Sequence, residues 1–229
     1  MNIKTTAKSL RDKLQKGIYV VINPIVKGLI AIGMTPNMVT TIGLLGNIAA
    51  AILFVIAGAL ASATGEIPYT MVTWAGGLII GFSLFDMLDG QVARIGGMAS
   101  TFGAMYDSVL DRYCELFTLG GISFFFLSSG NLGAALITYL AVIGSIMVSY
   151  VRARAEGLGL ECKIGFMQRP ERVVVTALGA LVTGILGQCG VEWADDVLIY
   201  AMLLIAIFAN LTAAARIAYS GKQLKNKKQ

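Results

Sequence analysis

The chain has 229 residues, of which 56% are hydrophobic and only 14% charged, with a formal net charge of +5 and a mean hydropathy of +0.76. This composition lies outside the range of soluble globular proteins, and long apolar runs recur, so we expect an all-α integral membrane protein. The chain has no histidine and its three cysteines are scattered, which excludes a Ser–His catalytic pair and argues against a zinc site. Any chemistry must then rest on Asp, Glu, Arg, Lys or a metal ion held by oxygen ligands.

The first 34 residues predict a basic arm followed by an amphipathic helix that lies on the membrane surface. Five basic residues precede the apolar stretch GIYVVINPIVKGLIAIGM, and Pro24 and Lys27 interrupt it. A helix of this kind buries its apolar face at the headgroup boundary. A short first membrane span is the alternative, and we expect no cleavable signal peptide.

Six longer apolar segments follow, and each is long enough to cross about 30 Å of hydrocarbon as an α-helix. Turn-forming stretches such as TGEIPY, SSGN and QCGVEWADD separate them. The expected transmembrane helices cover 37–60, 70–95, 100–128, 132–158, 170–190 and 195–219. The predicted organisation is an arm and surface helix over 1–34, a six-helix transmembrane domain over 35–219 and a basic cytoplasmic tail over 220–229.

The distribution of basic residues predicts the orientation in the membrane. Of the 18 lysines and arginines, all but Arg112 fall on one side: in the N-terminal arm, at 94, between 152 and 172, and from 216 onward. The loops on the other side carry acidic residues and no base. The positive-inside rule makes the basic side cytoplasmic, with both termini there. The positive charge suits this topology and anionic lipid headgroups, and it gives no reason to expect a nucleic-acid partner.

Four aspartates stand in the segment FDMLDGQVARIGGMASTFGAMYDSVLD, where two apolar segments meet. Asp86 and Asp89 are three residues apart on one expected helix, and Asp107 and Asp111 are four apart on the next, so each pair shares a helix face. A short connection makes the two helices antiparallel neighbours, and the four carboxylates then converge near the cytoplasmic surface. Carboxylates at membrane depth are rare and usually mark a functional site. The alternative is a set of helix-end charges that reach into water.

Clustered carboxylates repel one another strongly in a low dielectric, and a bound divalent cation relieves that repulsion. Oxygen-only ligands favour Mg²⁺, Mn²⁺ or Ca²⁺. Four carboxylates can hold two metal ions, an arrangement that stabilises the attacking and leaving oxygens of a phosphoryl displacement. Arg94 follows at the same membrane level, where its guanidinium could contact a phosphate.

The pattern D-x2-D-G-x2-A-R-x8-G-x3-D-x3-D, from Asp86 to Asp111, resembles the signature of the CDP-alcohol phosphotransferase family at all eight fixed positions. Such enzymes move a substituted phosphate from a CDP-linked donor to an alcohol and release CMP. The resemblance implies that Asp86, Asp89, Asp107 and Asp111 hold two Mg²⁺ or Mn²⁺ ions, and that Asp111 is also the catalytic base.

The same resemblance implies further contacts and a location. The CDP part of the donor lipid would be bound by Gly90, Arg94 and Ser100, and by Thr35, Pro36 and Asn37 in the segment TPNMVT. Relatives often carry Asp where this chain has Asn37, so the chain departs from the family there. The family also implies a homodimer in the cell membrane, with the active site facing the cytoplasm.

A cluster of arginines bears on the identity of the acceptor alcohol. The segments SYVRARAEGLGL and GFMQRPERVV, with the end of the last span, hold only Arg at five positions where Lys would serve topology equally well. Guanidinium pairs bidentately with phosphate, so these arginines predict an anion-binding pocket. The alternative is that they only flank the membrane spans as positive charge on the cytoplasmic side. The pattern resembles the phosphatidylinositol-phosphate synthases of the family, which implies an inositol phosphate acceptor bound by Arg152, Arg154, Arg172 and Arg216. Relatives often have Lys at position 152.

The sequence thus predicts transfer of the phosphatidyl group from CDP-diacylglycerol to inositol phosphate, a step of phospholipid biosynthesis. The same chemistry with glycerol 3-phosphate, free inositol or serine stays open, as does an ether-lipid or ceramide-type donor, because apolar helices do not specify the lipid tail. A cation transporter also uses intramembrane carboxylates. Against it, the aspartates cluster at one membrane face and the sequence has no evident inverted repeat.

Overall fold

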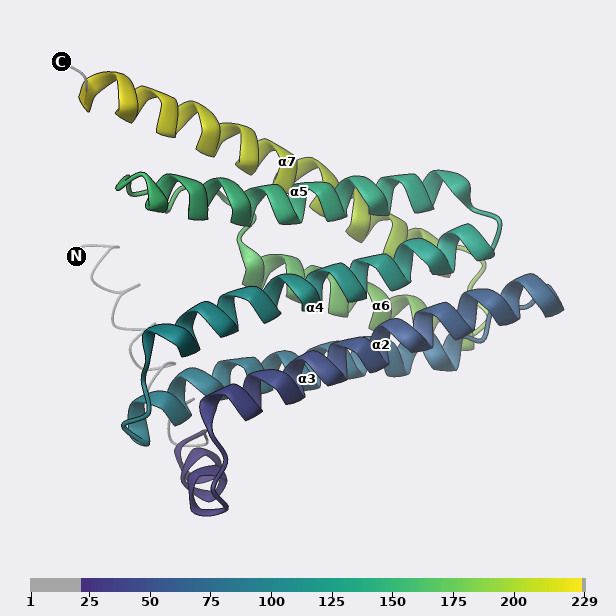
Figure 1. The fold of residues 1–229 in the computed structure, drawn as a ribbon. Coiled ribbons are helices and arrows are strands. Elements are labelled where there is room, and N and C mark those ends of the chain that lie inside the picture. The colour runs from purple at the N-terminus through teal and green to yellow at the C-terminus, as the bar shows by residue number, and fades with distance from the viewer. Residues whose placement is uncertain (1–21, 228–229) are drawn as a thin grey trace, which may run out of the picture. The chain divides into compact units, whose positions relative to one another are not determined.

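The computed structural model of the chain describes residues 22–227, which are helical throughout apart from the connecting turns (Figure 1). A short helix, Ile22–Ala31, comes first. The longer helices are α2 (Pro36–Thr64), α3 (Tyr69–Ile95), α4 (Thr101–Ser128), α5 (Leu132–Gly157), α6 (Arg169–Gln188) and α7 (Ala194–Lys227). The predicted all-α fold is confirmed.

Five of the described helices are long and apolar enough to cross a membrane: α2, α3, α5, α6 and α7. The chain is therefore a multi-pass membrane protein. Helix α4 has 28 residues, enough in length for a crossing, but its first half is rich in charged side chains. That half contains Asp107 and Asp111, two of the four aspartates that the sequence singles out.

Helix ends within the described residues follow the predicted segments closely except at the end of the last helix. Helix α7 continues past the expected end at 219 to Lys227. The added stretch has no proline and contains good helix formers, and the Gln223 side-chain amide donates a hydrogen bond to the Glu161 carbonyl at 3.1 Å. The predicted basic arm and the start of the surface helix fall on residues 1–21, outside the described residues.

The described chain forms two compact units. The first consists of residues 22–43 with Leu84–Leu110, and the second of Leu44–Ser83 with residues 111–227. Val26 of the short helix packs with Val39, Leu88 and Val92 to form the core of the first unit. The second unit has a much larger apolar core, built from α2 to α7.

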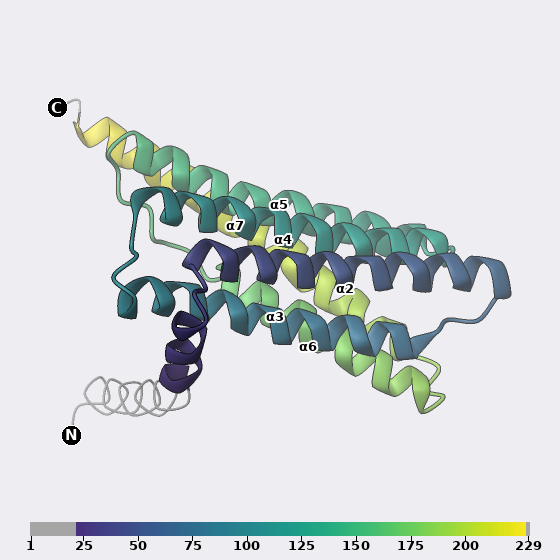
Figure 2. The same cartoon turned by 60° about the horizontal axis from the view of Figure 1, so that its bottom comes forward.

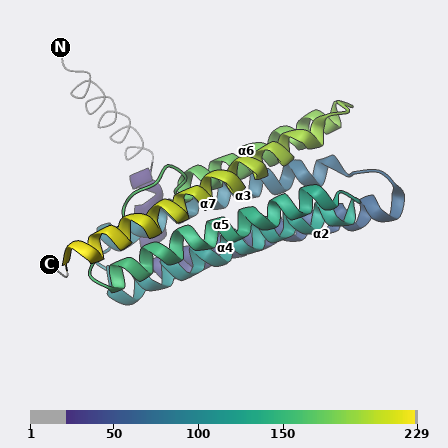
Figure 3. The ribbon, with the colours of Figure 1, turned by 90° about the horizontal axis from the view of Figure 1, so that it is seen from above.

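Within the second unit, α7 packs against both α5 and α6 (Figure 3). The parts of α2 and α3 that belong to this unit run antiparallel and are joined by the turn at Gly65 (Figure 2). Glycines sit where helix backbones approach closely. A Cβ on Gly121 of α4 would lie 2.9 Å from the Ala51 Cα of α2, whereas a Cβ on the preceding Gly120 would meet nothing within 4 Å. Small residues allow such close approach between membrane helices.

This contrast gives a matched pair of variants. Gly121→Ala is expected to destabilise the protein by about 1–3 kcal/mol, because the added methyl group forces α2 and α4 apart. Gly120→Ala is expected to be neutral or to stabilise the protein by up to about 1 kcal/mol, because alanine is the better helix former. Thermal unfolding in detergent measures both. Equal melting temperatures for the two variants would contradict the close contact at Gly121.

Candidate functional site

The turn between α3 and α4 shapes the first unit. The Met98 N–H donates to the Ala93 carbonyl at 2.9 Å, and Gly97 has a φ of 63°. This is the left-handed helix ending for which glycine is favoured. Ser100 then caps α4, because its Oγ accepts a hydrogen bond from the Gly103 N–H at 2.9 Å. The end of α3 and the start of α4 are thereby fixed next to each other.

Three of the four signature aspartates meet in this unit. Asp86 and Asp89 of α3 and Asp107 of α4 each offer a carboxylate oxygen, and the three oxygens lie within 4.8 Å of one another. Asp89 is buried, while Asp86 and Asp107 are half-buried. The Thr40 hydroxyl donates to Oδ2 of Asp89 at 2.6 Å, which fixes the orientation of this carboxylate. A set of three carboxylates fits a hard divalent cation such as Mg²⁺ or Mn²⁺.

A cavity of about 270 Å³ opens beside these aspartates, and Asp89 and Asp107 form part of its wall. Its size is near the lower end of the roughly 300–1,000 Å³ of small-molecule sites. Five of the six residues that we expected to contact the CDP group line it: Pro36, Asn37, Gly90, Arg94 and Ser100. The first unit therefore brings carboxylates, an arginine and amide and hydroxyl groups around one space.

The sixth expected residue, Thr35, is not among the residues that line this cavity. Its hydroxyl oxygen accepts a hydrogen bond from the Met38 N–H at 3.3 Å, so it caps α2, with Pro36 as the first helical residue. The Arg94 side chain is exposed, and its Nε donates to the Gly90 carbonyl at 3.1 Å. That contact anchors the guanidinium at the cavity wall.

Asp111 belongs to the second unit, where arginines surround it. Its Oδ1 lies 2.8 Å from Nη2 of Arg169, and its Oδ2 lies 3.6 Å from Nη1 of Arg112. The carboxylate is thus held in an ion pair at the start of α6. Its expected roles as metal ligand and base stay predictions.

The predicted phosphate-binding arginines also lie in the second unit, in different surroundings. Arg172 is 2% exposed, and its Nε and Nη2 donate to Oε1 of Glu115 at 2.9 and 2.6 Å. Arg216 is equally buried, and it donates to the carbonyls of Ile164 and Val148 at 2.7 and 2.6 Å.

The other two arginines, Arg152 and Arg154, lie near the C-terminal end of α5. Arg152 forms an ion pair with Glu156 at 2.8 Å, and Arg154 is exposed in the last turn of the helix. Arg152, Arg172 and the acidic Glu156 all lie close enough to Arg216 to interact with its charge. Three of the four arginines therefore lie near one another, with Glu115 and Glu156 paired to two of them, and the binding of an acceptor phosphate there stays a prediction.

Three residues at these sites have no assigned role in the sequence analysis. Nothing in the sequence marks Thr40 as functional, because a threonine in an apolar helix is ordinary and its partner Asp89 is 49 residues away. Glu115 could have been found, since it continues the four-residue spacing of Asp107 and Asp111 on α4. Arg169 belongs to the arginine cluster, but only the structure pairs it with Asp111.

Known proteins with similar sequences cover most of the chain, including the residues of both units described above. A sequence profile described as CDP-alcohol phosphatidyltransferase matches residues 33–210. A phosphatidylinositol phosphate synthase of Corynebacterium glutamicum is 31% identical to the chain, over 91% of this chain and 87% of the relative. An archaetidylinositol phosphate synthase of Methanothermobacter thermautotrophicus is 34% identical, over 73% of this chain and 79% of the relative.

Solved structures agree with the sequence comparison. The crystal structure of Mycobacterium tuberculosis phosphatidylinositol phosphate synthase with CDP-DAG bound matches the chain with a TM-score of 0.74 and 29% identity, over 87% of this chain and 93% of that one. The same enzyme in complex with manganese and citrate matches equally well, with a TM-score of 0.74. The signature residues, the profile match and the relatives together show that the chain belongs to the CDP-alcohol phosphatidyltransferase family.

Proposed function

We propose that the chain transfers the phosphatidyl group of CDP-diacylglycerol to inositol phosphate, giving phosphatidylinositol phosphate and CMP at the cytoplasmic face of the membrane. The convergence of Asp86, Asp89 and Asp107 beside the 270 Å³ cavity carries this proposal, because the cavity joins a cation site to a space for an anionic headgroup. The names of the relatives support inositol phosphate as the acceptor.

The three clustered aspartates would hold the metal ions. Asp111 follows Asp107 by four residues, and this spacing proposes Asp111 as the fourth ligand of a two-ion site. Bound Mg²⁺ or Mn²⁺ neutralises charge on the donor pyrophosphate and on the departing CMP. The manganese complex of the mycobacterial enzyme supports this choice of ion.

The CDP group would occupy the cavity of the first unit, where Arg94 offers its guanidinium to the pyrophosphate and Asn37 and Ser100 offer polar groups. The acyl chains would remain in the bilayer. A site at the membrane surface suits a donor whose headgroup is polar and whose tails are not. Thr35 would contribute by capping α2 and so holding Pro36 and Asn37 in place.

Asp111 would accept the proton of the acceptor hydroxyl, since an alcohol is a weak nucleophile without a base. The hydroxyl oxygen then forms a bond to the phosphorus of the phosphatidyl group, and the bond from that phosphorus to the oxygen of CMP breaks. CMP leaves with the electron pair of that bond. Arg152, Arg154, Arg172 and Arg216 would supply positive charge for the acceptor phosphate.

A second candidate differs only in the donor lipid. The archaeal relative is named for an archaetidyl rather than a phosphatidyl product, and nothing in the apolar helices specifies the tail. An ether-lipid donor is therefore the alternative. A homodimer is the assembly that we propose from the family resemblance.

The acceptor is tested by CMP release from purified protein in CDP-diacylglycerol micelles with Mg²⁺. The acceptors are inositol 1-phosphate, free inositol, glycerol 3-phosphate and serine, one at a time, and CDP-archaeol replaces the donor in a parallel series. We expect release only with inositol 1-phosphate. Release with another alcohol instead would keep the aspartate chemistry and overturn the proposed acceptor.

Metal binding is tested with Mn²⁺ by electron paramagnetic resonance. Asp89→Asn is expected to abolish high-affinity binding, because it removes the buried carboxylate of the cluster. Thr40→Val is expected to weaken Mn²⁺ affinity by about 10- to 100-fold, as loss of a hydrogen bond to a ligand does elsewhere. Glu66→Gln removes one exposed carboxylate in the α2–α3 loop and serves as the control. Unchanged affinity in Asp89→Asn would refute the site.

The base is tested with Asp111→Asn, which is expected to lower kcat by a factor of about 100 to 10,000 while the protein still folds. Asp196→Asn, an exposed change at the start of α7, is the control and should keep full activity. Melting temperatures establish that both variants are folded. Near-normal turnover in Asp111→Asn would remove Asp111 from the mechanism.

A further inference from the structure

Helices α4 and α6 are joined by two ion pairs. Asp111 and Glu115 are one turn apart on α4, and Arg169 and Arg172 are three residues apart on α6, so each pair lies on one helix face. Asp111 pairs with Arg169 at 2.8 Å, and Glu115 pairs with Arg172 at 2.6 Å. Acidic side chains of one helix thus face basic side chains of the other over two successive turns.

The ion pair between Arg172 and Glu115 is almost fully buried. The side chains of Arg172 and Glu115 are 2% and 6% exposed, so water does not compete for their hydrogen bonds. Nε and Nη2 of Arg172 both donate to Oε1 of Glu115, and Nη1 donates to the Met167 carbonyl at 3.0 Å. These contacts use three of the N–H groups, and an arginine carries five.

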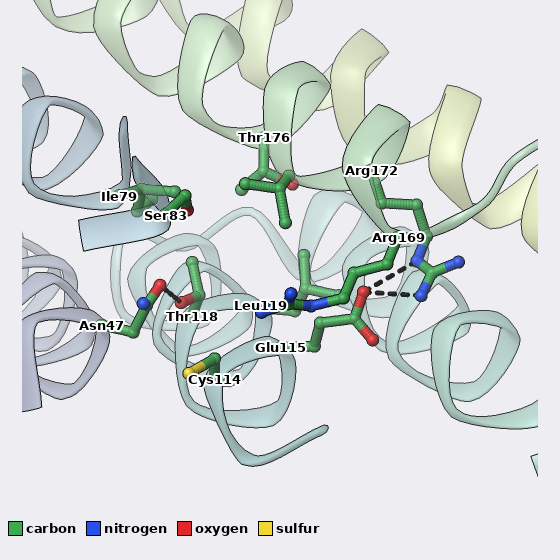
Figure 4. A pocket seen from close by; sticks show the side chains of 11 residues that line it. Asn47, Ile79, Ser83, Cys114, Glu115, Thr118, Leu119, Arg169, Arg172 and Thr176 are labelled. Atoms are coloured by element: carbon green, nitrogen blue, oxygen red, sulfur yellow. Dashed lines mark hydrogen bonds and ion pairs between the residues drawn. The ribbon is translucent and has the colours of Figure 1, made fainter. Parts of the chain in front are cut away.

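The side-on contact with Glu115 constrains Arg172 to one orientation. Figure 4 shows the Glu115 carboxylate directed at the guanidinium, with both dashed lines ending on one oxygen, and Arg169 lying next to them on the same pocket wall. Without Glu115, the long arginine side chain has several rotamers of similar energy. A guanidinium fork binds an oxyanion well only when its plane is held in position.

We propose that Glu115 is a positioning residue for the acceptor site: it holds Arg172 so that its remaining N–H groups receive the acceptor phosphate. The inference rests on the proposed function, in which Arg172 binds that phosphate. Glu115 lies one turn, about 6 Å along α4, from the proposed base Asp111. The two ion pairs therefore hold Arg172, proposed to bind the phosphate, and Asp111, proposed to activate the hydroxyl, along the same contact between α4 and α6.

The test is steady-state kinetics of CMP release with Glu115→Gln, varying inositol 1-phosphate and CDP-diacylglycerol in turn. The expected result is a rise of about tenfold in the KM for inositol 1-phosphate, since a charge-assisted hydrogen bond that orients Arg172 is lost. The KM for CDP-diacylglycerol should stay within about twofold. An unchanged acceptor KM, or a parallel rise in both KM values, overturns the inference.

A double variant separates positioning from general loss of structure. Arg172→Lys keeps the charge but loses the fork, so it should raise the acceptor KM alone. Adding Glu115→Gln to Arg172→Lys should raise that KM no further, because the orientation that Glu115 imposes is already lost. Independent, multiplying effects would show that Glu115 acts elsewhere.

Two further variants make the test decisive. Glu115→Asp keeps the buried charge and replaces Glu115→Gln if the latter does not fold; a smaller rise, confined to the acceptor KM, supports the inference. Glu171→Gln removes an exposed carboxylate next to Arg172 in sequence and should leave both KM values unchanged. Wild-type protein that releases no CMP with inositol 1-phosphate would refute the proposed function instead, whatever the Glu115 variants do.

Discussion

A charged side chain inside an apolar helical protein needs a charged or hydrogen-bonding partner where it lies, because hydrocarbon cannot solvate it. For a carboxylate, an oppositely charged side chain and a bound cation are two such partners. The second unit uses side chains, since Arg169 and Arg172 lie 2.8 and 2.6 Å from Asp111 and Glu115. The first unit gathers three carboxylates within 4.8 Å of one another, an arrangement that a divalent cation would stabilise.

Helix α4 carries the groups on which both solutions depend. Asp107, Asp111 and Glu115 follow one another at intervals of four residues and form a polar stripe along this helix. The stripe lowers the mean hydropathy of a helix that is otherwise long enough to span a membrane. Such a stripe is tolerated only where neighbouring helices offer partners, as Arg169 and Arg172 of α6 do for its second half. The carboxylates that make α4 less apolar than the other long helices are therefore the same residues that supply its candidate functional groups.

The sequence predicts what is periodic along the chain. Helix positions follow from apolar lengths, and the meeting of Asp86, Asp89 and Asp107 follows from spacings of three and four residues with a short connection. Partners from distant segments have no such signal: 49 residues separate Thr40 from Asp89, and 57 separate Glu115 from Arg172. Only the tertiary fold brings them together. Helix α7 extends to Lys227, past the predicted end at 219. A basic stretch is typical of a solvated tail, but its lysine, glutamine and leucine residues also favour a helix.

The arginines show why a cluster of charge in a sequence does not by itself define a binding site. Arg216 donates to the carbonyls of Val148 on α5 and Ile164 in the following loop, so it fastens these two segments to α7. Gly165 lies against Thr212 of α7 so closely that a Cβ there would clash. A buried guanidinium that closes the fold in this way is also fixed in space, as a rigid phosphate site requires. In the proposed function, stability and phosphate recognition would both depend on these hydrogen bonds, and a loss of activity on substituting Arg216 would not distinguish the two. The ratio of the two KM values does, because only recognition distinguishes the phosphorylated acceptor from the lipid donor.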